Sequence, residues 1–173
     1  FHTGRKKIIA MKKAFHGRTS GAVAATDNPK IIAPFNADHQ VEFVPMNDVS
    51  ALAQTIDEKT AAVIIEGMQG VAGVYVPTDE YLEEAQRLCR EVGAMLILDE
   101  VQSGAGRSGR FFAYQSASIQ PDIIPLAKGI GNGFPVGMVL IAPHIQPWHG
   151  MLGTTFGGNH LACAAVLAVL EVI

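Results

Sequence analysis

The sequence predicts a three-layer α/β/α sandwich with a mostly parallel sheet. Short apolar runs recur along the chain, among them AAVIIE at 61–66 and AMLILDE at 94–100, and segments with helical spacing of apolar residues separate them. Both runs are apolar without alternation, which is typical of strands that are covered on both faces. With 173 residues, of which 49% are hydrophobic and 17% charged, the chain is long enough to bury such a core.

The expected elements in the first half of the chain are marked by capping residues. The chain opens on a basic, strand-like segment, and VEFVPM at 41–46 is the next expected strand. Asp48 is a residue type that caps helices, and it starts a short helix that runs through Ile56. The next helix begins at Thr78 and ends at Gly93, and its apolar positions follow helical spacing: Leu82, Ala85, Leu88, Cys89 and Val92.

Three further segments complete the predicted sandwich. DIIPLAK at 122–128 and GMVLIA at 137–142 are shorter strands, and 161–173 is an apolar helix. A helix that is apolar almost all round needs partners on several sides. We therefore expect the chain to be part of a longer protein, with further elements or another subunit covering this helix.

Composition and charge argue against several classes of function. The net charge of −3 gives no reason to expect a nucleic-acid partner. The six histidines lack the spacing of metal ligands, so we expect no metal site. No apolar run is long enough for a membrane span, there is no signal-peptide pattern, and the two cysteines lie far apart. We expect a cytoplasmic protein with no membrane partner, since such cysteine usage fits a reducing compartment.

Basic residues gather near the start of the chain. We expect them mainly on the solvated flank of the first strand, with a polyanion-binding patch as the alternative: Arg5, Lys6, Lys7, Lys12 and Lys13.

Three polar residues are expected at one edge of the sheet. Glu66 and Asp99 each end a strand, and Lys128 follows the strand DIIPLA. In open α/β sheets ligands bind beyond the carboxyl ends of the strands, so these side chains mark a candidate site.

The residue types at this edge allow specific chemistry. Asp99 either caps the next turn or presents a fixed negative charge to a cationic ligand atom, and Gln102 can reach the same space. Lys128 lies in LAKGIGNGFP next to an apolar strand, where desolvation favours a neutral amine that can form a Schiff base with a carbonyl. A solvated surface lysine is the alternative. The glycines after Lys128 do not follow the dinucleotide-binding pattern, and we interpret them as allowing close backbone approach.

Two other loops are candidates on local grounds. GTTFGGN at 153–159 could hold a phosphate with its hydroxyl and N–H groups at the start of the last helix, although an ordinary capped loop is equally consistent. FHGRTSG at 15–21 carries an aromatic residue and an arginine, and Phe15 as core and Arg18 as a surface ion pair remain the local interpretation.

Several segments, in order, resemble class III aminotransferases of the fold type I group, above all the acetylornithine and succinylornithine aminotransferases: AFHGRTSGAVAAT, IIEGMQGVAGVYVP, LILDEVQSGAGRSGRFFA, PDIIPLAKGIGNGFPVG and LGTTFGGNHLACAAVLAVL. The resemblance covers nearly the whole chain and implies pyridoxal 5'-phosphate as the cofactor. It also implies that residues 1–173 are the cofactor-binding large domain, incomplete at both ends and without the small C-terminal domain.

The resemblance implies a role for each matching residue at the cofactor. Lys128 would bind the cofactor covalently and then move the proton between it and the substrate carbon. Asp99 would pair with the pyridinium nitrogen, so that the ring withdraws electrons. Gln102 would hydrogen-bond the phenolic oxygen, and Phe15 would stack on the ring. Thr155 would reach the cofactor phosphate of the neighbouring subunit, which implies a homodimer with a shared active site.

Two residues would act on the substrate. Arg18 is the expected partner of a substrate carboxylate, by bidentate pairing. Glu66 matches the first acid of the family's E-P-x-Q-G-E motif and would order the substrate side of the site.

The motif departs from the family at two positions. Gly67 replaces a proline, and Val71 replaces a glutamate that pairs with a C-terminal arginine in relatives and lets one site accept two substrates. Without that acid, the resemblance favours an N-acylated ornithine, reacting at its terminal amine, as the donor and 2-oxoglutarate as the acceptor, as in arginine biosynthesis. Another ω-amine transaminase, an aminomutase or racemase, and a catalytically inert structural fragment remain as alternatives.

Overall fold

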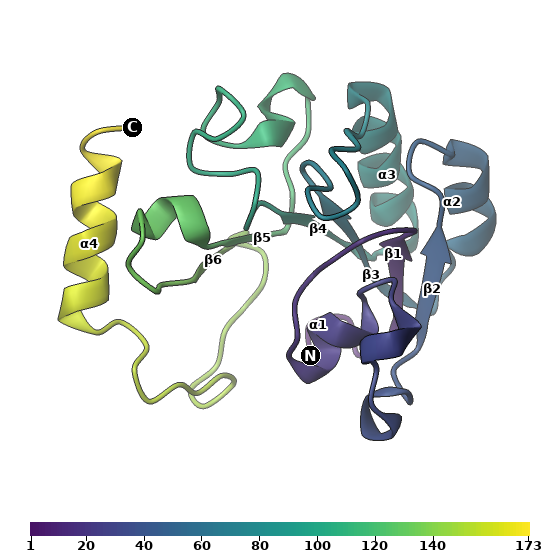
Figure 1. Cartoon of the computed structure of the whole chain (residues 1–173). Coiled ribbons are helices and arrows are strands. Elements are labelled where there is room, and N and C mark those ends of the chain that lie inside the picture. Colours follow the sequence, from purple (N-terminus) through teal and green to yellow (C-terminus); the bar gives the residue numbers. More distant parts are fainter.

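A six-stranded sheet forms the centre of the structure, a computed structural model that describes residues 1–173. The strand order is β2–β1–β3–β4–β5–β6 (Figure 1). The strands span β1 Lys7–Met11, β2 Val41–Val44, β3 Thr60–Glu66, β4 Met95–Asp99, β5 Ile123–Leu126 and β6 Met138–Ile141. All neighbours are parallel except β5 and β6, so the predicted mostly parallel sheet is confirmed. β6 runs antiparallel because the short segment from β5 to β6 contains no crossover helix.

Helices lie on both faces of this sheet and beyond its β6 edge. They are α1 Ser20–Ala24, α2 Val49–Thr55, α3 Asp79–Val92 and α4 His160–Leu170, with short 3₁₀ turns η1 Pro29–Ile31, η2 Pro34–Asn36, η3 Ala113–Ser116 and η4 Lys128–Gly131. Figure 1 shows α2 and α3 together on one face, α1 on the other, and α4 apart from them on the β6 side. The α/β/α layers are present, although α1 covers little of its face.

The predicted caps set the helix ends. Asp48 Oδ1 accepts a hydrogen bond from Ala51 N at 2.9 Å, and Thr78 Oγ1 accepts one from Tyr81 N at 3.1 Å. Gly93 ends α3 in the left-handed region, with φ of 68°, a conformation that glycine adopts without a steric penalty. These polar contacts explain why the boundaries of α2 and α3 could be predicted.

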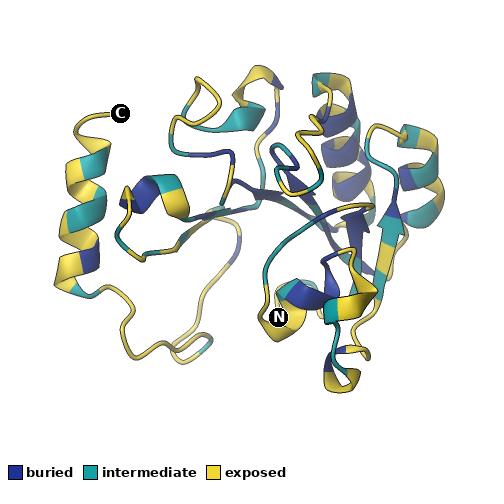
Figure 2. Ribbon diagram, viewed as in Figure 1, coloured by how far each residue is buried: buried dark blue, intermediate teal, exposed yellow.

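The main core lies between the sheet and the α2–α3 layer. Its members include Ile9, Leu52, Ile65, Leu82 and Leu96, all of them buried. Figure 2 shows β1, β3, β4 and the inner side of α3 largely in the buried colour, whereas β2, β6 and α4 are mostly intermediate or exposed. A helix as apolar as α4 that contacts little beyond η4 agrees with the expectation that other elements cover it.

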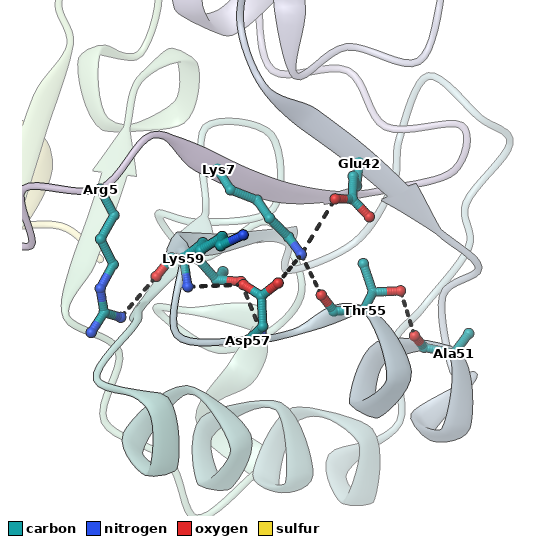
Figure 3. Close-up of polar contacts among 8 residues, drawn as sticks. Arg5, Lys7, Glu42, Ala51, Thr55, Asp57 and Lys59 are labelled. Atoms are coloured by element: carbon teal, nitrogen blue, oxygen red, sulfur yellow. Dashed lines mark hydrogen bonds and ion pairs between the residues drawn. The ribbon is translucent and has the colours of Figure 1, made fainter.

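Two of the basic residues near the start bind structural groups. Lys7 Nζ lies 2.5 Å from the Thr55 carbonyl oxygen, 3.0 Å from Asp57 Oδ2 and 3.3 Å from Glu42 Oε1 (Figure 3). Arg5 donates hydrogen bonds to the carbonyls of Thr60 and Val92. The expectation of a solvated flank is therefore wrong for these two side chains, which are partly buried and bound within the fold, and the polyanion patch loses two of its five members. No helix of the structure has the length and apolar character that a bilayer crossing requires.

Candidate active site

The sheet brings the three predicted edge residues to one place. Glu66 and Asp99 are the last residues of β3 and β4, and they face each other in the parallel register. Lys128 begins η4, two residues after the end of the neighbouring strand β5. The candidate site therefore lies at the carboxyl ends of the central strands, as parallel sheets predict.

A cavity of about 100 Å³ lies at this edge and joins five of the predicted residues. Its lining consists of Phe15, His16, Gly17, Glu66, Val71, Asp99, Val101, Gln102 and Lys128. The chain segments that supply these residues are separated by up to about a hundred positions. The fold, rather than local sequence, creates the site.

Lys128 and Gln102 are in direct contact in this cavity. Lys128 Nζ donates a hydrogen bond to Gln102 Oε1. Lys128 has φ of 49°, in the left-handed region that residues other than glycine seldom adopt, so η4 holds the lysine in a constrained backbone conformation. The predicted close approach after Lys128 is present at Gly131, where a Cβ would lie 2.7 Å from Val136 Cγ1.

Asp99 is held by two hydrogen bonds at the base of the cavity. Its Oδ1 accepts from Val101 N at 3.0 Å, and its Oδ2 lies 2.8 Å from His16 Nδ1. The side chains of Asp99 and His16 are 8% and 2% exposed. A carboxylate oxygen accepts more than one hydrogen bond, so Asp99 can still receive an N–H or a cation from a ligand.

His16 is a site residue that sequence reasoning did not single out. It lies between Phe15 and Gly17 in a segment where only Phe15 and Arg18 were considered, and its partner is 83 positions away. Its Nε2 is buried without a hydrogen-bond partner. The only sequence feature that points to His16 is its place in the FHGR segment. That segment does not indicate that the imidazole reaches the end of β4.

Glu66 fixes the segment that carries Phe15. Its Oε1 accepts a hydrogen bond from Phe15 N at 3.0 Å, and only 5% of the residue is exposed. Burial raises the pKa of the Glu66 carboxyl, against the lowering effect of the Phe15 N–H. Phe15 is half-buried on the cavity wall, where an aromatic face can contact a flat ligand.

Two predicted residues lie outside the cavity. Arg18 precedes α1 and Thr155 lies in the loop before α4, and both are exposed. Neither belongs to the cavity lining. Their predicted contacts, with a substrate carboxylate and with the cofactor of a neighbouring subunit, involve molecules outside this chain and stay predictions.

The combined side chains can bind one kind of ligand well. A lysine amine reacts with a carbonyl, an amide accepts or donates at a polar ring substituent, and a buried carboxylate attracts a protonated ring nitrogen. The site thus offers a ligand an amine, an amide and a buried carboxylate beside the Phe15 side chain.

Comparison with known proteins identifies the family. The family model described as Aminotransferase class-III matches residues 1–173, the whole chain. The chain belongs to the class III aminotransferases. The predicted family is therefore confirmed.

Similar members of the class III aminotransferases carry several names. An acetylornithine aminotransferase of Methanopyrus kandleri is 48% identical over 176 residues, covering 99% of this chain and 45% of that protein. A Pyrococcus horikoshii relative named for LysW-aminoadipate semialdehyde/glutamate semialdehyde transamination is 46% identical, covering 99% of this chain and 46% of that protein. The chain thus spans less than half the length of these relatives.

Solved structures of transaminases share the fold. Ornithine aminotransferase from Toxoplasma gondii, crystallised with partial occupancy of pyridoxal 5'-phosphate, superposes with a TM-score of 0.87 at 34% identity, covering 98% of this chain and 41% of that one. An (S)-enantioselective omega-transaminase from Thermomicrobium roseum gives 0.83 at 32% identity, covering 96% and 44%. The fold is the α/β fold of pyridoxal-phosphate-dependent aminotransferases.

The residues of the cavity fit the cofactor of the class III aminotransferases, pyridoxal 5'-phosphate. Three groups of the lining match polar parts of this cofactor by their chemistry: an amine such as Lys128 condenses with an aldehyde, a carboxylate such as Asp99 pairs with a protonated ring nitrogen, and an amide such as Gln102 hydrogen-bonds a phenolic oxygen. The orphaned Nε2 of His16 adds a buried polar group beside Asp99 that no contact within the chain satisfies.

Proposed function

We propose that the whole protein transfers the terminal amine of an N-acylated ornithine, such as acetylornithine or succinylornithine, to 2-oxoglutarate, as in arginine biosynthesis. The observation that carries the reaction type is the joint presence of Lys128, Asp99 and Gln102 in one cavity. Residues 1–173 would be the cofactor-binding part of the large domain.

Five residues of the cavity have a part in this reaction. Bound pyridoxal 5'-phosphate supplies an aldehyde that condenses with amines and a ring that withdraws electrons. Lys128 Nζ holds the cofactor and then moves the proton at the substrate carbon. The Asp99 carboxylate keeps a proton on the ring nitrogen, and His16 keeps that carboxylate in orientation. Gln102 binds the phenolic oxygen, and Phe15 covers the ring face.

The substrate-binding roles rest on charge and position. Arg18 is an exposed cation three residues after Phe15, and a guanidinium binds a carboxylate through two parallel hydrogen bonds. Glu66 orders the Phe15 segment and so shapes the substrate side of the cavity. Thr155 lies away from the cavity of its own chain, which agrees with a contact to the cofactor of a second subunit in a homodimer.

The preference for an acylated donor rests on Val71 and on the relatives. Val71 lines the cavity with an aliphatic side chain, so this position offers no negative charge to the free α-amine of ornithine. Relatives at 43–48% identity include several acetylornithine aminotransferases. The Pyrococcus name supports one further candidate, the transamination of another terminal amine on a masked amino acid.

Both cysteines are unpaired, which supports a cytoplasmic location.

A panel of amines tests the substrate. The whole protein, loaded with pyridoxal 5'-phosphate, is mixed with acetylornithine, succinylornithine, ornithine or 4-aminobutyrate, and the loss of the cofactor's aldehyde absorbance is followed. We expect the acylated ornithines to react fastest, and 2-oxoglutarate to restore the absorbance. A Lys128→Ala variant is the control without the reactive amine. Exclusive reaction with 4-aminobutyrate would contradict the substrate, and failure of every amine would contradict the function.

A further inference from the structure

The turn that follows β4 carries Gln102 from the sheet to the cavity. The Glu100 N–H donates a hydrogen bond to the Pro125 carbonyl oxygen of β5 at 3.1 Å. The Gly104 N–H donates one to the Glu100 carbonyl oxygen at 2.9 Å. Gln102 therefore lies in the middle of a turn, residues 100–104, whose backbone is bonded at both ends.

The contacts around Gly104 show how tightly this turn is closed. A Cβ at position 104 would lie 2.7 Å from the Glu100 carbonyl oxygen and 2.7 Å from Leu126 Cδ2. The carbonyl oxygen belongs to the backbone and cannot rotate away, so the turn can close only because position 104 has no side chain. The path of residues 100–104 is thus fixed by packing as well as by hydrogen bonds.

The Glu100 side chain holds the same turn from inside the fold. Glu100 is 0% exposed and Ser103 is 3% exposed. Glu100 Oε2 accepts a hydrogen bond from Ser103 Oγ at 2.6 Å, and Oε1 accepts one from Tyr114 N at 3.3 Å. None of the ion pairs in the structure includes Glu100, so these two hydrogen bonds hold its carboxyl in place. The carboxyl thereby joins the turn to η3.

We propose that Glu100 is a positioning residue for Gln102. Asp99 lines the cavity, whereas the next residue, Glu100, does not, as the alternation of side chains along a strand predicts. Gln102 lies between Glu100 and Ser103, whose side chains are bonded to each other, and its Oε1 accepts the hydrogen bond of Lys128 Nζ. The Glu100–Ser103 bond thus sets the place from which Gln102 reaches Lys128. The role of Gln102 at the cofactor rests on the proposed function, whereas its contact with Lys128 is a property of the chain alone.

Labelling of Lys128 in the cofactor-free whole protein tests this positioning. Glu100→Leu keeps the bulk of the side chain and removes both of its hydrogen bonds. Once Gln102 is displaced, the Lys128 amine no longer has to leave a hydrogen bond before it attacks a reagent. We expect an amine-acylating reagent to label Lys128 about fivefold faster, the ratio that corresponds to one net hydrogen bond. Peptide mapping by mass spectrometry measures this rate.

Two further variants are the controls for labelling. Glu100→Gln can still accept the Tyr114 N–H and should restore the wild-type rate. Gln86→Leu is the matched control, because it removes a different buried side chain, whose Nε2 donates to the Gln120 carbonyl oxygen at 2.6 Å. A Glu100→Leu rate equal to that of Gln86→Leu would overturn the positioning role.

A second background shows whether Glu100 acts through Gln102. Gln102→Ala should itself speed the labelling of Lys128, and Glu100→Leu should then add less than about twofold. The full increase in both backgrounds would overturn an action through Gln102. If Glu100→Leu does not fold, Ser103→Ala, which removes the hydroxyl donor, takes its place with the same expectations.

The cofactor-loaded protein gives a spectroscopic test. We expect Glu100→Leu to move the pH midpoint of the bound cofactor's absorbance by about half a pH unit or more, and Gln86→Leu to leave it in place. An unmoved midpoint in the folded Glu100 variant would overturn the role at the cofactor. A wild-type protein that binds no cofactor would contradict the proposed function, and the labelling rates would still decide the positioning of Gln102.

Discussion

Asp99 is the residue on which the chemistry of the site depends most. Its carboxylate is nearly buried and oriented by Val101 N and His16 Nδ1, so it presents a fixed negative charge to the cavity. A fixed charge stabilises an opposite charge on a ligand better than a mobile one does, since the side chain need not reorganise when the ligand binds. Asp99 thus caps the next turn through Val101 N, as one of its two sequence interpretations predicts, and its pairing with a cationic ligand atom stays a prediction.

Neutralising Asp99 should separate cofactor binding from catalysis. In Asp99→Asn the shape of the side chain is kept, but the amide no longer stabilises a proton on the ring nitrogen. We expect Lys128 still to bind the cofactor covalently, while transamination slows by about 100-fold or more. Single-turnover absorbance kinetics measures both. Turnover equal to that of the wild-type protein would exclude the electron-withdrawing role of this pair.

Restoring an acid at position 71 should change the preferred amine. Val71→Glu places a carboxylate on the cavity wall, where it attracts a substrate with a free α-ammonium group and gives no such gain with an acylated one. We expect the ratio of kcat/KM for ornithine to kcat/KM for acetylornithine to rise by about tenfold. Val71→Gln, which is polar but uncharged, is the control. An equal rise in both variants would show that charge is not the cause.

The sequence could predict site residues where a strand end or a motif marked them. Five of the predicted residues line the same cavity: Phe15, Glu66, Asp99, Gln102 and Lys128. His16 was missed because its role depends on reaching β4 across the fold, which no local pattern encodes. The positions of Arg18 and Thr155 agree with partners outside this chain, so their roles stay predictions.

At the scale of elements, Lys7 joins strand β1 to the end of helix α2. Its side chain is 11% exposed, and its ammonium binds the Thr55 carbonyl near the end of α2 as well as two acids (Figure 3). A cation at a helix C-terminus is favourable because the last carbonyls lack partners within the helix.

Removing the Lys7 side chain should therefore destabilise the fold. We expect Lys7→Ala to lower the free energy of unfolding by about 1–3 kcal/mol, since a nearly buried ammonium bonded to the Thr55 carbonyl is lost. Lys12→Ala removes an exposed lysine from the same strand flank and should change little. Urea titration of both variants measures the difference. Equal stability of the two variants would show that the Lys7 contacts are not stabilising.

Glu100 makes the stability of the β4–η3 connection depend on pH. Burial raises the pKa of its carboxyl above the ordinary value of 4.5. At a pH below 4.5 the Glu100 carboxyl is protonated in both the folded and the unfolded chain. At a pH between 4.5 and the raised pKa, only the unfolded chain has lost this proton. Rising pH therefore favours unfolding across this window, and the penalty is complete above the raised pKa.

The Glu100→Gln variant isolates this effect. Because glutamine does not titrate, we expect the free energy of unfolding of the wild type, minus that of the variant, to fall as the pH rises from about 4 through the raised pKa. Urea titrations over the pH series supply these values. A difference that stays constant, or that grows with pH, would contradict a raised pKa.

At the scale of the whole molecule, the sequence predicted the main strands and the ends of α2 and α3 better than the connections between elements. The apolar runs of β3 and β4 and the caps of α2 and α3 are local signals, and they were sufficient. The antiparallel direction of β6 and the short turns η1–η4 follow from chain connection and packing, which no apolar period reveals. The exposure of α4 could not be predicted from its apolar sequence either, because burial of a helix depends on which other elements pack against it.

The central claim is that the amine of Lys128 is the covalent attachment point of pyridoxal 5'-phosphate, with Asp99 on the opposite side of the ring. The most direct test is borohydride reduction of the cofactor-loaded whole protein, followed by peptide mapping by mass spectrometry. We predict a reduced pyridoxyl group on Lys128 alone, and none there in a sample reduced before loading. Modification of a different lysine, or an unmodified Lys128 in a protein that retains the cofactor, would contradict the account.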